Sequence, residues 1–187
     1  MVTSVSPLAV INQVINPDIR YTIKNSSVLI KETDKSAILR KVEITGVDSN
    51  TVAFEFDKSG HTGKAFNSTH KKVHKACDAI IFCQLDDEYF ILFCELKTSV
   101  PSDGKHVVQL RSGLCWVQYL RAILNEFEGI DMSHWQYRYI VFHKNQYLPK
   151  TLTSIAPIAN QQPRTPLLCQ VDDGEKVSLR KLLQQPL

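Results

Sequence analysis

The stretch from Cys77 to Lys97, CDAIIFCQLDDEYFILFCELK, constrains the fold more than any other part of this chain. Two apolar runs flank an acidic cluster, a pattern that predicts two antiparallel strands joined by a tight turn. If Asp86 and Asp87 form a two-residue loop, Asp78 lies directly opposite Glu95, with Cβ atoms about 5 Å apart. A turn one or two residues longer would change this pairing.

Lys97 follows Glu95 by two residues, so both side chains project from the same face of the strand. Two facing carboxylates in otherwise apolar strands repel each other and cost stability. A divalent cation bound between Asp78 and Glu95 would neutralise this repulsion, so the pair is a candidate metal site. Glu95 and Lys97 could otherwise form a surface ion pair of little energetic value. A run of Phe, Ile, Leu, Phe and Cys precedes Glu95, however, and indicates a buried strand.

The 187 residues are enough for one well-buried core and too few to need two. We therefore expect a single domain over residues 1–187, with a core at about 27–143 and a C-terminal extension at 148–187. The 43% apolar content fits a globular protein, and no apolar run approaches the roughly 20 residues that span a bilayer. Five cysteines without a CxxC pair indicate a reducing compartment, so we expect a cytoplasmic protein without disulfides or membrane association.

Local patterns predict the elements on either side of the hairpin. Ser6-Pro7 and the apolar residues up to Ile15 predict a short helix, which Asn16-Pro17 ends. Strand-like runs predict an antiparallel first half, at residues 28–30, 37–44 and 51–56, with a helix as the alternative for the first run. A turn at residues 172–174 and a short helix capped by Ser178 form a small C-terminal unit.

A longer helix is expected from about Ser102 to Asn125. Its buried stripe consists of apolar residues at helical spacing, namely Leu110, Leu114, Val117, Leu120 and Leu124. Gly113 would let this helix approach the sheet closely. The aromatic alternation at 135–143 predicts another strand, and the order strand–helix–strand predicts that it runs parallel to a strand of the sheet.

Residues 58–76 carry five lysines and three histidines but no acidic residue, although the net charge of the whole chain is only +3. The simplest interpretation is a solvated loop. The segment leads directly into Asp78, however, where its positive charge would suit a phosphate backbone. The candidate nucleic-acid contacts are Lys64, His70, Lys71, Lys72, His74 and Lys75.

An Asp at the start of one strand, Glu-x-Lys at the end of the next and a following helix that bears Gln resemble the PD-(D/E)xK nuclease superfamily. The resemblance covers roughly residues 72–143, and its specific part is Asp78, Glu95, Lys97 and Gln109. It implies an α+β, restriction endonuclease-like fold, in which helices flank a mixed central sheet. It also implies that Asp78 and Glu95 bind Mg²⁺, with Mn²⁺ as an alternative. Lys97 would then act at the nucleophilic water, and Gln109 would orient the site.

Many members of the superfamily have a further acidic ligand on an early helix, but the helix expected at residues 7–15 has no acidic residue. Glu32, Glu43 and Glu55 are the candidates for this ligand. Glu32 is preferred because of its position relative to the hairpin.

The resemblance implies a metal-dependent endonuclease or exonuclease that hydrolyses phosphodiester bonds, with DNA favoured over RNA. Mg²⁺ takes oxygen ligands and keeps several waters, so two carboxylates can hold it and leave room for a phosphate. Small nucleases of this kind often act as homodimers or beside a partner subunit, for instance in phage defence or mobile-element biology. The alternative is a non-catalytic nucleic-acid-binding or assembly module on the same fold. A third hypothesis is a protein-interaction domain without a nucleic-acid role.

Overall fold

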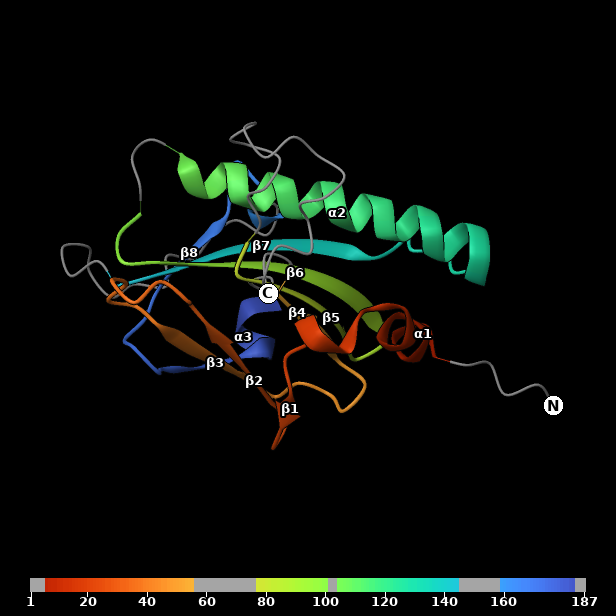
Figure 1. Ribbon diagram of the computed structural model, residues 1–187, viewed down its shortest axis with the longest axis horizontal. Helices are drawn as coiled ribbons and strands as arrows, with labels where there is room; N and C mark the ends of the chain where they lie inside the picture. The colour runs from red at the N-terminus through yellow and green to blue at the C-terminus, as the bar shows by residue number, and fades with distance from the viewer. Residues whose placement is uncertain (1–5, 56–76, 101–103, 145–158, 184–187) are drawn as a thin grey trace.

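The computed structural model describes residues 6–55, 77–100, 104–144 and 159–183. In these ranges the chain forms two β-sheets and three α-helices, which confirms the expected α+β class. Figure 1 shows the layers: a long helix lies above the larger sheet, and the smaller sheet lies below it. No helix in these ranges is both long and apolar enough to cross a membrane.

The larger sheet has five strands in the order β4-β5-β6-β7-β8. Their bounds are β4 (Val52–Phe54), β5 (Ala79–Leu85), β6 (Glu88–Lys97), β7 (Gln136–His143) and β8 (Leu167–Gln170). The first three strands are antiparallel, whereas β6, β7 and β8 run parallel to one another. The predicted hairpin and the predicted parallel strand at 135–143 are therefore both confirmed.

The hairpin of β5 and β6 has the register expected from the shorter turn. Leu85 faces Glu88 across a two-residue turn, and the pairing continues without a slip to Ala79 opposite Cys94. Asp86 adopts a φ of 53° in this turn. Asp tolerates this left-handed conformation better than most residues because its short polar side chain can hydrogen-bond locally.

The smaller sheet has the order β1-β2-β3-β9. Its strands are β1 (Ile23–Lys24), β2 (Ser27–Lys31), β3 (Lys41–Thr45) and β9 (Lys176–Ser178). The strand predicted at 37–44 begins later, at Lys41, because a turn precedes it. Ser36 donates two hydrogen bonds to Asp34 Oδ1, from its backbone N at 2.9 Å and from its hydroxyl at 2.7 Å.

The described residues of the expected C-terminal extension contribute a strand to each sheet and side chains to the core. β8 pairs with β7 in the larger sheet, and β9 pairs with β3 in the smaller one. Asp173 supports the pairing of β9 with β3, because its Oδ1 accepts hydrogen bonds from the backbone N–H groups of Arg40 at 2.7 Å and Lys41 at 3.0 Å. Both strands are short edge strands, so their sequences carry little periodic signal.

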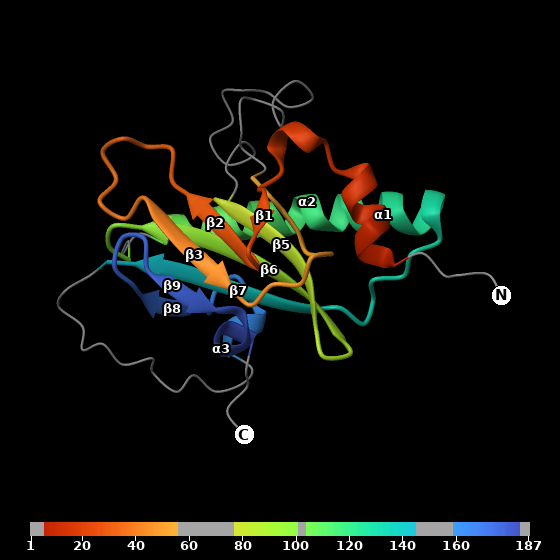
Figure 2. The same cartoon turned by 90° about the horizontal axis from the view of Figure 1, so that it is seen from below.

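The helices are α1 (Pro7–Val14), α2 (Lys105–Glu128) and α3 (Leu179–Leu183), with 3₁₀ turns η1 (Pro17–Ile19) and η3 (Ala159–Gln161). Side chains of the hairpin alternate between two cores. Ile80 and Phe93 pack with α1 and α2, whereas Ile81 and Leu92 pack with the smaller sheet and α3. Figure 2 shows the smaller sheet in front of the larger one, with α2 behind both.

Close packing of α2 on the sheet depends on Gly113, as predicted. A Cβ atom at this position would lie 2.9 Å from Cys77 Sγ and 3.2 Å from Phe93 Cδ1. The helix runs three residues further than expected, to Glu128, and the following Gly129 has a φ of 66°, which suits a glycine after a helix C-terminus. Four of the five residues of the predicted stripe are buried, and Leu114 is half-buried.

Candidate metal and catalytic site

Continuation of the hairpin register past Ala79 sets Asp78 opposite Glu95. Two hydrogen bonds fix the position of Asp78. Its carboxylate Oδ2 accepts the backbone N–H of Leu96 at 2.6 Å, and its main-chain oxygen accepts the hydroxyl of Tyr21 at 2.9 Å. Among the described residues, no hydrogen bond to the other carboxylate oxygen, Oδ1, accompanies these two.

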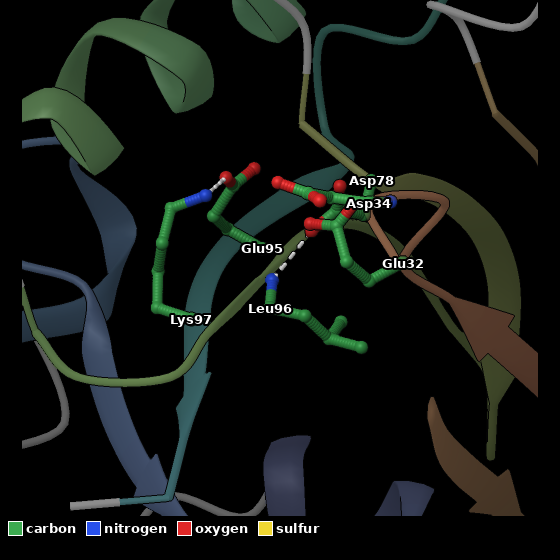
Figure 3. Close-up of polar contacts among 6 residues, drawn as sticks. All are labelled: Glu32, Asp34, Asp78, Glu95, Leu96 and Lys97. Atoms are coloured by element: carbon green, nitrogen blue, oxygen red, sulfur yellow. Dashed lines mark hydrogen bonds and ion pairs between the residues drawn. The ribbon is translucent and has the colours of Figure 1, made fainter. Parts of the chain in front are cut away.

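Glu95 and Lys97 lie on the face of β6 that α2 covers, because they continue the alternation of Ile91 and Phe93. Lys97 Nζ donates to Glu95 Oε1, which confirms that the two side chains share a face. Figure 3 shows Lys97 on one side of Glu95, with Asp78 on the other side in this view. The group lies at the end of β6, from which the chain passes to α2.

The hydrogen bonding of the buried Glu95 carboxylate is incomplete among the described residues. Its side chain is 0% exposed, and among the described residues its Oε2 has no hydrogen-bond partner. Burial raises the pKa of Glu95 to about 7, although the charge of Lys97 acts in the opposite direction. A buried carboxylate oxygen without a partner is costly to the fold, and a bound cation would satisfy it.

The neighbouring charges leave this small region with an excess of carboxylates. Burial, and then repulsion from Glu95, raise the pKa of Asp78 well above its ordinary value. Burial alone would lower the pKa of Lys97, but the attraction of Glu95, Asp78 and Glu32 outweighs it, so the net pKa is raised. Lys97 is therefore protonated at neutral pH, and one ammonium group faces several acidic groups.

Glu32 is an upstream candidate that the structure brings to the carboxylate pair. It follows the end of β2, and its charge raises the pKa of both Asp78 and Glu95. Figure 3 shows it beside Asp78. Glu43 lies instead on β3, where its Oε2 is 3.6 Å from Lys176 Nζ. The charge of Glu55 acts on Tyr21.

The donor set fits a hard divalent cation that keeps much of its water. Within the described ranges, no three Asp, Glu, His or Cys side chains lie close enough together to hold one ion directly. Mg²⁺ is commonly bound by one or two carboxylates with waters in its other positions, so Asp78 and Glu95 suffice as direct ligands. Glu32 can contribute through such a water.

Gln109 lies half-buried in the second turn of α2, next to the buried Leu110. Its role in orienting the site stays a prediction. The candidate nucleic-acid contacts, Lys64, His70, Lys71, Lys72, His74 and Lys75, lie outside the described residues.

A row of polar residues across the parallel strands was not predicted from the sequence. The registers set Lys97 beside His143 and His143 beside Gln170, and in-register neighbours share one face of a sheet. His143 is 2% exposed, and burial lowers its pKa, so it is neutral at neutral pH. Gln170 Oε1 is buried without a hydrogen-bond partner in the described part of the chain. A helical crossover does not fix strand register, so no signal in the sequence reveals this row.

No protein-family model matches the chain, and no curated protein or solved structure is significantly similar to it.

Proposed function

We propose that the chain is a Mg²⁺-dependent nuclease that hydrolyses phosphodiester bonds, with DNA as the preferred substrate. The observation that carries the proposal is the facing pair Asp78 and Glu95. Both carboxylates have raised pKa values, Glu95 Oε2 has no partner among the described residues, and Lys97 lies on the same face. A mixed sheet flanked by helices, with this pair at the end of a hairpin, also supports a restriction endonuclease-like arrangement.

Each residue has a role that its environment supports. Asp78 Oδ1 and Glu95 Oε2 would hold the ion, while the Leu96 N–H and the Tyr21 hydroxyl keep Asp78 in place. When bound, Mg²⁺ would lower the pKa of a coordinated water and would neutralise charge on the phosphate oxygens. Lys97 is protonated, so it stabilises negative charge that develops on the phosphate.

The cysteines support a reducing compartment, in which we propose that the protein acts. All five are free, and four of them are buried: Cys77, Cys83, Cys94 and Cys169. In such positions a thiol behaves as a small apolar side chain.

The test is cleavage of linear, circular and single-stranded DNA, and of RNA, with Mg²⁺, Mn²⁺ or EDTA. We expect metal-dependent cutting that falls at least about 100-fold in Asp78→Asn and in Glu95→Gln, which keep the side-chain shape but lose the charge. Glu43→Gln removes a carboxylate on β3 that faces Lys176 and serves as the control.

Cutting that survives in EDTA, or in Asp78→Asn, would contradict the proposed metal site. If no substrate is cut and calorimetry detects no Mg²⁺ binding, the nuclease proposal fails. Salt-dependent DNA binding in that case would identify a nucleic-acid-binding module instead.

A further inference from the structure

We propose that a second site, the polar pocket, binds a small polar ligand that carries an oxyanion. The polar pocket lies between α1, η1 and the turn that precedes β4, and its volume is about 510 Å³. This volume is in the range of small-molecule sites, which is about 300–1,000 Å³. Two residues of its lining, Arg20 and Thr51, present polar groups for which the described protein supplies no partner.

Arg20 provides a positively charged group whose orientation is already fixed. Its Nη1 donates to the main-chain oxygen of Asn12 at 2.9 Å and to Asn12 Oδ1 at 2.6 Å. These bonds hold the guanidinium against the last turns of α1, and both are made by the same nitrogen, Nη1. Within the described part of the chain, its Nε and Nη2 donate no hydrogen bond and no carboxylate forms an ion pair with it.

A guanidinium held in this way suits a phosphate or a carboxylate. Its planar fork presents parallel N–H donors that match two oxygens of an oxyanion, and little side-chain freedom is left to lose on binding.

Thr51 provides the second, independent observation. It lines the polar pocket, it is only 5% exposed, and its hydroxyl Oγ1 has no hydrogen-bond partner among the described residues. The turn before β4 does not need this hydroxyl, because the Thr51 N–H already donates to Asp48 O at 3.0 Å. Val would serve the start of the strand equally well. A buried hydroxyl without a partner is unfavourable unless a ligand atom completes it.

The rest of the lining narrows the ligand class. Side-chain amides of Asn12, Gln13 and Asn50 can bind hydroxyl or amide groups, and Leu8 and Ala53 offer a small apolar surface. The arrangement fits a ligand about the size of a sugar phosphate or a small hydroxy acid, with its oxyanion on Arg20 and a hydroxyl on Thr51. Neither Asp78 nor Glu95 lines the polar pocket, so ligand binding there does not depend on nuclease activity.

Tyr21 connects the polar pocket to the candidate site. It belongs to the lining of the pocket, and its hydroxyl donates to the main-chain oxygen of Asp78 at 2.9 Å. A ligand in the polar pocket therefore lies against a residue that positions Asp78.

The test is an NMR titration of the full chain with inorganic phosphate, ribose 5-phosphate and succinate. We expect saturable shifts of the amide signals of residues 49–53 and of the Arg20 Nε–H signal at millimolar ligand. The tighter of the phosphate and carboxylate arms identifies the oxyanion. Thr51→Val is expected to weaken binding by about 2- to 10-fold, which corresponds to one lost hydrogen bond. Arg20→Lys keeps the charge but loses the fork, and it is expected to weaken binding by at least about 10-fold.

Arg180→Lys is the matched control, because Arg180 is another surface arginine that lies far from this pocket in sequence and pairs with Asp86. Thr51→Val is expected to fold as the wild type does, because Oγ1 has no protein partner among the described residues to lose. The proposal is overturned if none of the three ligands shifts these signals. It is also overturned if Thr51→Val and Arg20→Lys bind as tightly as Arg180→Lys does.

Discussion

Replacing Glu95 with Gln tests whether the buried charge of Glu95 lowers the free energy of unfolding of the metal-free protein. Glu95 is fully buried, and burial raises its pKa from 4.5 to about 7. The folded protein therefore binds a proton at Glu95 more tightly than the unfolded chain does. Linkage then requires that metal-free protein lose stability as the pH rises from about 4.5 to about 7, and that the loss be complete above pH 7.

The size of the effect follows from the same values. Each tenfold change in proton affinity is worth about 1.4 kcal/mol, so a pKa raised from 4.5 to about 7 corresponds to about 3 kcal/mol. Gln cannot carry the charge, and its amide oxygen can still accept from Lys97. We expect Glu95→Gln to raise the free energy of unfolding by about 3 kcal/mol at pH 8 and by less than about 1 kcal/mol at pH 5.

The assay is urea unfolding of wild type and variant in EDTA at both pH values. Glu43→Gln serves as the control, since that half-exposed carboxylate faces Lys176 and should change stability by less than about 1 kcal/mol. Added Mg²⁺ should stabilise the wild type and leave Glu95→Gln unchanged. The reasoning is refuted if Glu95→Gln is less stable than wild type at pH 8, or if it gains equally at both pH values.

Two further substitutions test the packing and the support of the site. Gly113→Ala should destabilise the protein by about 1–3 kcal/mol in urea unfolding, because its Cβ would lie 2.9 Å from Cys77 Sγ. Ser112→Ala on the same helix is the control, and equal stability of the two variants would contradict the close packing. Tyr21→Phe removes the donor to the Asp78 main-chain oxygen, so it should cost about 1 kcal/mol and weaken Mg²⁺ binding in calorimetry. If both quantities stay at the wild-type values, Tyr21 does not position Asp78.

The central hairpin could be predicted because its register is set locally. A two-residue turn at Asp86-Asp87 fixes every pair between the two strands, including the one that sets Asp78 opposite Glu95. The same local logic placed Lys97 on the face of Glu95 and Gly113 against the sheet. These features need only the turn length and the periodicities of strand and helix.

Features that depend on distant pairing could not be predicted in this way. The proximity of His143 to Lys97 depends on the register between β6 and β7, which a long helix separates. Glu32 was preferred only on its position in the sequence, and its approach to Asp78 depends on how the smaller sheet packs on the larger one. The strands β8 and β9 have four and three residues, too few for alternation to distinguish them from loops.

The two sheets are completed only after the C-terminal strands β8 and β9 have been synthesised. β9 reaches β3 across most of the sequence, and the supporting bond from Arg40 N to Asp173 spans 133 residues. The hairpin that carries Asp78 and Glu95 needs only its own neighbours and can form within microseconds. During synthesis the two carboxylates can therefore come together well before either sheet receives its last strand. The nascent chain must keep the exposed edges of β3 and β7 from pairing with other strands in the meantime.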